Sequence, residues 1–204
     1  IYVIDNGVNM DKPNVRNRPN KVARNTLGFT GKMDYFANKS AIFYFYKYIF
    51  PEIIKHNSNI KLKIIGAFPD REIKLLGNRD SRIEIYGFAK NIQKELAQAQ
   101  IIISPLIVGA GIQNKILEAM NAAKPIVATK ISCRALNVKS GKELLIASSS
   151  SQFAQHVVYL LDNPAKGVKL GLSARRYVNK FHRWEDKVSE LEGVYQQTSI
   201  EVRR

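Results

Sequence analysis

The sequence predicts an α/β protein in which a parallel β-sheet is covered by helices on both faces. Short apolar or β-branched runs alternate with helical patterns along most of the chain. After Ile146 the pattern becomes wholly helical, and neither an internal repeat nor a long linker interrupts the chain. Strands that alternate with helices favour a parallel sheet, because each crossover lays a helix on one face of it. The expected architecture is therefore Rossmann-like.

Six segments have the composition of buried strands, because each is a short apolar or β-branched run next to turn or polar residues. They are TLGFTG (26–31), IKLKIIG (60–66), IEIYG (83–87), QIIISPL (100–106), PIVAT (125–129) and ELLIAS (143–148). The opening residues, IYVIDNG (1–7), also predict a strand followed by a turn.

Helices are predicted between and after these strands. Ala41, Phe45, Tyr48 and Ile49 recur at helical spacing and form a one-sided apolar stripe. Further helices are expected at 91–98, 113–122, 151–162, 165–181 and 184–197.

The chain is expected to form one domain over residues 1–204. The four serines at 148–151 are too few for a convincing linker. Ser149 with Gln152 three residues later instead matches a capping box for the helix at 151–162. The chain begins at Ile1 without a methionine and starts directly with a predicted strand, so we expect it to be a piece of a longer protein.

Composition limits the partners and the compartment. The formal charge of +15 favours anionic partners, namely phosphorylated ligands, nucleic acid or an anionic membrane, although a solvated lysine-rich surface is an equally good explanation. The basic residues are scattered and no RNA-stacking signature is found, so no specific nucleic acid is expected.

Cys133 is the single cysteine and fits a reducing, cytoplasmic location. No apolar run reaches the roughly 18 to 20 residues of a membrane span, and no signal peptide is recognised, while peripheral contact with the inner membrane face stays open.

The stretch GAGIQNKILEAM (109–120), directly after IIISPLIV, is the main functional signal. Ligands of such sheets bind beyond the carboxyl ends of the strands, where helices begin. Glycines allow close approach of the backbone, and N–H groups at a helix start favour phosphate. Lys115 adds a positive charge, and Glu118 can accept two hydrogen bonds from a vicinal diol such as ribose. Phosphate beside a diol indicates a nucleotide.

Two common nucleotide-binding motifs are absent. GAGIQN approaches the dinucleotide pattern G-x-G-x-x-G, but Asn114 replaces the third glycine. No Asp or Glu follows from Val127 to Lys139, where the ribose-binding acid of that motif is expected, so an oxidoreductase is disfavoured. No P-loop sequence is present either.

A family resemblance extends over essentially the whole chain. Its pieces are NGV (6–8), TGKMD (30–34), IIG (64–66), IYGF (85–88), ISPL (103–106), KILEAMNAAKPIVAT (115–129) and FHRWEDKVSELEGVY (181–195). In this order they resemble the C-terminal half of a GT-B glycosyltransferase of the retaining family 4, or group 1. The start of the helix at 113–122 is similar to that of exopolysaccharide-type sugar transferases, G-x-Q-N-K-x-L-E-A-M.

The resemblance implies a domain that binds a UDP- or GDP-linked sugar donor, with a glycan or lipid-linked acceptor held by a separate N-terminal domain. It implies that Lys32 after Gly31 contacts the diphosphate, that Glu118 binds the ribose, and that the backbone at 87–89 frames the base. A helix from about residue 184 would bridge to the N-terminal domain. The expected ligand-binding residues are Gly31, Lys32, Gly87, Phe88, Gly111, Ile112, Gln113, Asn114, Lys115 and Glu118.

The chain departs from the family pattern in two places. Ala110 stands where the first glutamate of the E-x7-E motif is expected, which puts the sugar contacts in doubt. The second phosphate-binding lysine has no match at 36–38, and Lys39 or Lys115 could replace it. The plainer alternatives are a surface pair between Glu118 and Lys115 or Asn114, a solvated Lys32, purely capping roles for Gln113 and Asn114, and a core position for Phe88.

The expected function is therefore donor binding in a retaining glycosyltransferase, with this fragment inactive by itself and with no catalytic residue assigned. His56, His156 and His182 lack metal-ligand spacing, and no D-x-D pair is present, so no metal and no cofactor are expected. Two alternatives stay open, namely a nucleotide-sugar epimerase of GT-B architecture and a basic polyanion-binding module.

Overall fold

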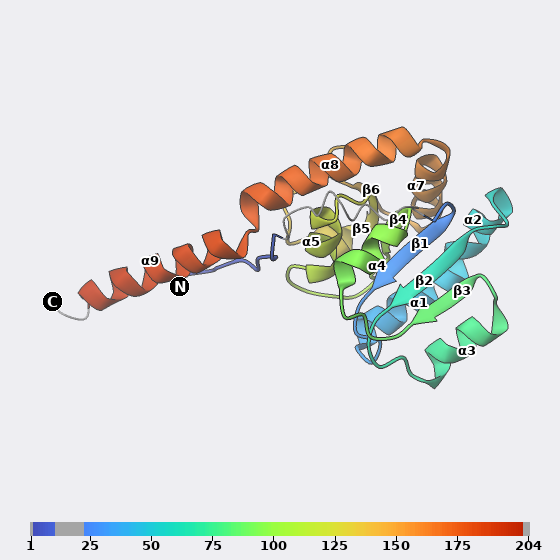
Figure 1. Ribbon diagram of the computed structural model, residues 1–204, viewed down its shortest axis with the longest axis horizontal. Coiled ribbons are helices and arrows are strands. Elements are labelled where there is room, and N and C mark those ends of the chain that lie inside the picture. The colour runs from blue at the N-terminus through green and yellow to red at the C-terminus, as the bar shows by residue number, and fades with distance from the viewer. Residues whose placement is uncertain (1, 11–22, 202–204) are drawn as a thin grey trace.

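The computed structural model describes residues 2–10 and 23–201, in which six parallel strands form one sheet (Figure 1). The strand order is β3-β2-β1-β4-β5-β6. The strands are β1 (Thr26–Thr30), β2 (Lys61–Ile65), β3 (Ile83–Tyr86), β4 (Ile101–Ser104), β5 (Ile126–Thr129) and β6 (Leu145–Ala147). All six strands predicted from residue 26 onward are confirmed, with ends that differ by no more than two residues.

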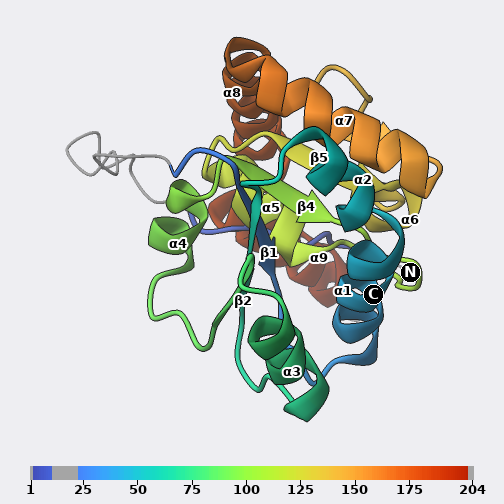
Figure 2. The ribbon, with the colours of Figure 1, turned by 90° about the vertical axis from the view of Figure 1, so that its right-hand side faces the viewer.

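Helices cover both faces of the sheet (Figure 2). One face carries α1 (Phe36–Tyr48), α2 (Phe50–His56), α3 (Arg71–Arg79) and α7 (Ser150–Asp162). The other face carries α4 (Ile92–Gln98), α5 (Asn114–Asn121) and α8 (Pro164–Phe181). The short α6 (Lys130–Cys133) follows β5, and α9 (Trp184–Glu201) follows α8. The predicted Rossmann-like α/β fold is confirmed.

The central strands supply apolar side chains to two separate cores. On β4, Ile101 and Ile103 join the core beneath α1 and α7, whereas Ile102 joins the core beneath α5 and α8. This alternation follows from the two-residue period of a strand. A strand buried on both faces has to be apolar throughout, which explains why β4 consists of three consecutive isoleucines before Ser104.

The prediction of one apolar stripe over residues 41–49 is only partly confirmed. Ala41, Phe45 and Ile49 are buried, but Tyr48 is 51% exposed. The helix ends at Tyr48, and α2 begins at Phe50 with Pro51 in its first turn, where a missing N–H is tolerated. The chain therefore changes direction near Ile49, and a single helical stripe does not continue through this segment.

The N-terminal strand prediction is wrong. Within the described residues of that segment, 2–7 form no strand, and Tyr2 and Val3 are 60% and 79% exposed. Val8 makes an isolated parallel bridge to Arg183, and the Tyr2 hydroxyl lies 3.3 Å from Gln197 Oε1 on α9. Figure 1 shows this segment beside α9, which extends away from the sheet. The prediction for Ile1 lies outside the described residues.

The helix cap at Ser149 is confirmed. The Ser149 hydroxyl accepts a hydrogen bond from the Gln152 N–H at 3.1 Å. The Gln152 amide oxygen in turn accepts from the N–H of Ser148 at 2.7 Å, one residue before the cap. The serines at 148–151 therefore lead from β6 directly into α7 and do not form a linker.

Candidate functional site

The candidate site lies beyond the carboxyl ends of β1 and β4, where the strand order reverses direction. From β1 the chain crosses to β2 on one side, and from β4 it crosses to β5 on the other side. The helices that follow these strands, α1 and α5, consequently pack on opposite faces (Figure 2). Such a point of reversal leaves a crevice between the two connecting loops, and ligands of open α/β sheets bind there. Gly31 and Lys32 follow β1, and residues 109–118 follow β4.

Lys115 and Asn38 connect the two sides of this crevice. The Lys115 ammonium group donates a hydrogen bond to Asn38 Oδ1 and lies 4.7 Å from the centre of the Phe29 ring. The Asn38 side chain is buried, and its Nδ2 donates to the backbone oxygen of Lys32 at 2.8 Å. The start of α5 is therefore tied through Asn38 to the loop that carries Lys32.

Burial changes the pKa of both charged groups on α5. Burial lowers the pKa of the Lys115 ammonium group to about 8, and the nearby Glu118 carboxylate opposes this shift. Burial raises the pKa of Glu118, and the positive charge of Lys115 opposes that shift. A desolvated ammonium group gains most from an anionic ligand, because the ligand restores the stabilisation that water no longer supplies.

The Glu118 carboxylate is available to a ligand. Among the described residues, no side chain or backbone group hydrogen-bonds to the Glu118 carboxylate, and no ion pair joins it to Lys115. Only the Glu118 backbone oxygen has a partner, Gln93 Nε2 at 3.3 Å. The proposed surface pair between Glu118 and Lys115 or Asn114 is therefore wrong, and both carboxylate oxygens can accept hydrogen bonds.

Lys32 is exposed but not simply solvated. Its ammonium group lies 3.1 Å from Asp34 Oδ2 and 5.2 Å from the centre of the Phe68 ring. The Lys32 side chain is 59% exposed, so an exposed pair of this kind holds it only weakly. Lys32 can therefore turn toward a bound anion at little cost.

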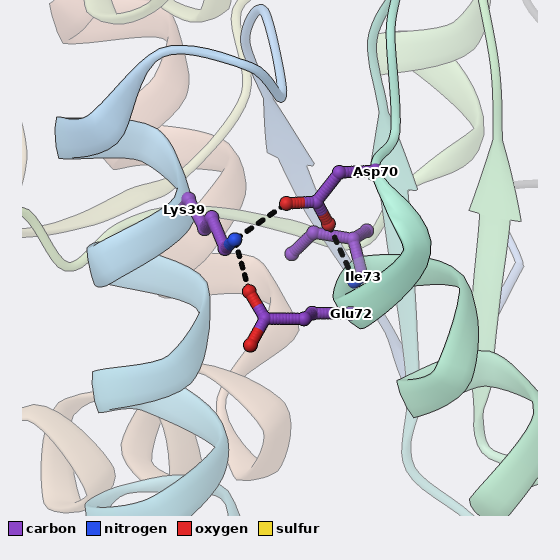
Figure 3. A network of polar contacts seen from close by, with 4 residues as sticks. All are labelled: Lys39, Asp70, Glu72 and Ile73. Carbon is purple, nitrogen blue, oxygen red and sulfur yellow. Dashed lines mark hydrogen bonds and ion pairs between the residues drawn. The ribbon is translucent and has the colours of Figure 1, made fainter.

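Lys39, one alternative for the second phosphate-binding lysine, is paired with two carboxylates. Its ammonium group contacts Asp70 Oδ2 at 2.5 Å and also the Glu72 carboxylate (Figure 3). Asp70 additionally accepts from the Ile73 N–H at 2.9 Å and so caps α3. Hydrogen bonds to Asp70 and Glu72 raise the pKa of Lys39. Lys115, the other alternative, makes no ion pair among the described residues and is bonded to the neutral Asn38 amide.

Two glycines shape the loops around the crevice, one through a close backbone contact and one through its backbone conformation. A Cβ placed on Gly66, at the end of β2, would lie 1.7 Å from the backbone oxygen of Gly31. The turns after β1 and β2 therefore touch through their backbones. Gly111 has a φ of +66°, a left-handed conformation that strains other residues, and no atom lies within 4 Å of the position of its missing Cβ.

Neither Gln113 nor Asn114 caps α5 with its amide side chain. Gln113 occupies the N-cap position without a capping side-chain bond, and its Nε2 donates to the Ala110 oxygen at 3.1 Å. Asn114 Oδ1 accepts from Asn6 Nδ2 at 3.1 Å. Ile112 is half-buried and packs against the core beneath α5. The purely capping alternative for Gln113 and Asn114 is therefore wrong.

Gly87 and Phe88 lie beyond the end of β3. Phe88 is 75% exposed, so the alternative that places it in the core is wrong. No atom lies within 4 Å of the position of a Cβ on Gly87, and its backbone oxygen accepts from the Gly66 N–H at 3.1 Å. This segment is connected to the β2 turn and leaves an aromatic ring open to solvent.

Sequence reasoning missed two residues of this site. Asn38 lies in the segment 36–38, where the expected lysine is missing, and Asn6 belongs to the NGV motif at 6–8, but the sequence alone gives neither residue a ligand-binding role. A buried Asn in the first turn of α1 is itself a signal, since buried amides need partners, but the partner Lys115 is 77 positions away.

Within residues 2–10 and 23–201, no group of three or more His, Cys, Asp or Glu side chains is placed to hold a metal ion. No helix in the same ranges is long and apolar enough to cross a bilayer.

Comparisons with known proteins agree with this architecture. A family model described as "Glycosyl transferases group 1" matches residues 24–163. An uncharacterized 44.6 kDa protein in the cps region of Klebsiella pneumoniae is 27% identical over 165 residues, which cover 74% of this chain and 41% of that protein. Glycosyltransferase 1 domain-containing protein 1 of Xenopus tropicalis is 30% identical over 132 residues, which cover 62% of this chain and 38% of that protein. The chain thus spans about two fifths of the length of these relatives.

Solved structures share the fold. A TarM mutant from S. aureus, in complex with fondaparinux, α-GlcNAc-glycerol and UDP, matches with a TM-score of 0.79 and 17% identity over 96% of this chain and 39% of that one. Anabaena HepE in complex with UDP and glucose matches with a TM-score of 0.74 and 15% identity over 97% of this chain and 56% of that one. At these identities the likeness concerns the fold.

Proposed function

Because this chain belongs to the glycosyl transferases group 1 family, we propose that it is the part of a retaining glycosyltransferase that binds the nucleotide-sugar donor. The full protein would transfer the sugar to a polysaccharide or lipid-linked acceptor held by another domain. The similar TarM and HepE structures were obtained with UDP, which makes a nucleoside diphosphate the first ligand to test.

The observation that carries this proposal is the placement of Lys115 and Glu118 on one turn of α5 at the crevice. Lys115 reaches across to Asn38, next to the loop of Lys32, so two ammonium groups are available to a diphosphate. Glu118, three residues further along α5, leaves both carboxylate oxygens for the ribose hydroxyls. Two ammonium groups and an acceptor for a diol at this spacing suit a nucleoside diphosphate better than a simple phosphate.

The chemistry follows from this placement. The bond between the anomeric carbon and the diphosphate oxygen breaks, and its electron pair stays on the diphosphate. Lys32, Lys115 and the N–H groups of the loop at 109–114 would stabilise the charge that develops there, without a metal ion. The acceptor hydroxyl forms the new bond and loses its proton to a group that this chain does not supply. We therefore propose that the fragment binds the donor but does not transfer the sugar by itself.

Ala110 affects how the sugar part of the donor could be bound. It is exposed and contributes no side-chain acceptor, whereas the family pattern has a glutamate at this position. Its backbone oxygen is already bonded to Gln113 Nε2. The affinity of the chain should therefore come mainly from the nucleotide, and UDP and UDP-glucose should bind almost equally well if uracil is the base that the site selects.

Calorimetric titration of the purified chain with UDP, GDP and a short DNA duplex, at low and high salt, tests the proposal. We expect one of the two nucleotides to bind with one-to-one stoichiometry and to retain most of its affinity in high salt, because Lys115 and Glu118 are partly shielded from the solvent. Binding of both nucleotides and DNA only at low salt, with equal strength, would contradict a specific donor site.

A further inference from the structure

The outer face of α8 is rich in basic residues, and the helix contains no acidic residue. Its 18 residues contain Lys166, Lys169, Arg175, Arg176 and Lys180 but no Asp or Glu. The chain as a whole has 17 acidic residues against 32 basic ones, so a helix of this length without any acid is a local concentration of charge. This concentration was not evident from the linear sequence, where the basic residues look scattered.

Four of these residues form a single line along the helix, which we call the basic stripe: Lys166, Lys169, Arg176 and Lys180. Their spacings of three, seven and four residues return to the same side of an α-helix, and all four are exposed. The stripe is about 21 Å long, from about 1.5 Å per residue. The residues of α8 that face the core lie on the opposite side, and they are Gly167, Leu170, Gly171, Ala174 and Val178.

The stripe is not neutralised by its surroundings. No ion pair reaches any of its four residues from the part of the chain that the structure describes; Lys180 contacts only the Phe181 ring, at 5.2 Å. The acidic residues that flank α8 are engaged elsewhere. Asp162 contacts His56, and Glu185 and Asp186 contact Arg183. The positive charge of the stripe is therefore directed at the solvent.

Apolar side chains adjoin the stripe. Val168 and Leu172 lie one turn apart beside it and are 59% and 48% exposed. A surface that only needs to be soluble gains nothing from two exposed aliphatic side chains next to a row of basic residues. Basic side chains beside exposed aliphatic ones suit contact with a membrane interface, where cations bind anionic headgroups and short aliphatic side chains reach the acyl boundary.

We propose that the outer face of α8 docks on an anionic lipid bilayer. The basic stripe binds acidic headgroups, while the long Lys and Arg stems and the Val168 and Leu172 side chains contact the upper acyl region. Nucleic acid fits this face less well, because it would leave the exposed Val168 and Leu172 side chains without an apolar partner. The inner side of α8 packs on α5, so a docked bilayer would contact the side of α8 that faces away from α5.

Co-sedimentation of the 204-residue chain with vesicles tests this proposal, which does not depend on the donor-binding function. One set of vesicles is phosphatidylcholine alone, and the other is phosphatidylcholine and phosphatidylglycerol in equal parts. We expect binding to the second set only. Lys166→Glu combined with Lys169→Glu and Arg176→Glu should weaken that binding at least tenfold.

Two further variants make the test specific. The matched control is Lys61→Glu with Lys74→Glu and Arg79→Glu, three exposed basic residues on β2 and α3, which change the net charge equally and should lower binding no more than about threefold through general attraction. Val168→Ser with Leu172→Ser should weaken binding to vesicles but not to duplex DNA. Circular dichroism confirms that each variant is folded.

The proposal is overturned if the control reversal weakens binding as much as the stripe reversal, which would indicate net charge alone. It is also overturned if the stripe reversal has no effect. Tighter binding to duplex DNA than to the acidic vesicles, with vesicle binding unaffected by Val168→Ser with Leu172→Ser, would instead assign this face to nucleic acid.

Discussion

Lys115 on α5 and Asn38 on α1 are hydrogen-bonded across the crevice between β1 and β4, although they are 77 positions apart in the sequence. The bond joins the two faces of the sheet at the point where its topology reverses. Asn38 also holds the backbone of Lys32, so one buried amide sets the relative position of both candidate phosphate-binding lysines.

A charge at position 38 should impair diphosphate binding more than the loss of the amide does. Asn38→Asp places a carboxylate against the Lys115 ammonium group, which neutralises the cation and repels the ligand. Asn38→Ala removes the tether but leaves Lys115 charged. Isothermal titration with UDP or GDP should give the order wild type, Asn38→Ala, Asn38→Asp in falling affinity. If Asn38→Asp bound as tightly as Asn38→Ala, Lys115 would have no contact with the diphosphate.

Diphosphate affinity should fall as the pH rises through about 8. Burial lowers the pKa of Lys115 to about 8, so the free protein loses this cation above that pH, and the ligand must then bind a neutral amine. Affinity measured between pH 7 and 9 should therefore decline in the wild type and stay flat in Lys115→Met.

Lys124 supplies the control for this pH profile. Burial lowers its pKa to about 8 as well, but its ammonium group donates to the Ala97 oxygen at 2.8 Å, away from the crevice. Lys124→Met should keep the decline in affinity that the wild type shows. A flat profile in Lys124→Met, with a decline preserved in Lys115→Met, would exchange the roles of the two lysines.

Gly66 should be intolerant of any side chain, because a Cβ there would meet the Gly31 oxygen at 1.7 Å. Gly66→Ala forces the turns after β1 and β2 apart, and a steric change of this kind costs about 1 to 3 kcal/mol or more. Urea unfolding measures the loss. Gly87→Ala is the matched control, since no atom lies within 4 Å of that Cβ, and it should change the free energy of unfolding by less than about 0.5 kcal/mol.

The sheet could be predicted from the sequence because buried strands need continuous apolar runs, and those runs are local. The helix α3 was not identified, because Ile73 and Leu76 are the only residues of α3 that are buried, although Asp70 is a recognisable N-cap. The opening IYVIDNG is predicted as a strand from its apolar residues, yet among the described residues no strand pairs with it. Tyr2 instead lies against Gln197 on α9, and Val8, the next residue after this segment, bridges to Arg183.

The candidate site was predicted in part. Glu118 and Lys115 could be chosen because a helix start after a buried strand is where anions bind, and both lie at the crevice. Lys39 pairs with Asp70 and Glu72, and Lys115 bonds to Asn38. These contacts depend on which loops lie next to one another in the folded chain. No local pattern contains that information.

The most direct test of the donor-site account is calorimetric titration of Glu118→Ala with whichever of UDP and GDP the wild type binds, alongside its 2′,3′-dideoxy analogue. Glu84→Ala, at an exposed position on β3, is the control. If Glu118 accepts both ribose hydroxyls, Glu118→Ala should weaken nucleotide binding by about 1.5 to 3 kcal/mol, the range for hydrogen bonds to a charged group, and should leave the weaker binding of the dideoxy analogue nearly unchanged. If Glu118→Ala binds both ligands as the wild type does, Glu118 does not bind ribose, and α5 is only part of the scaffold.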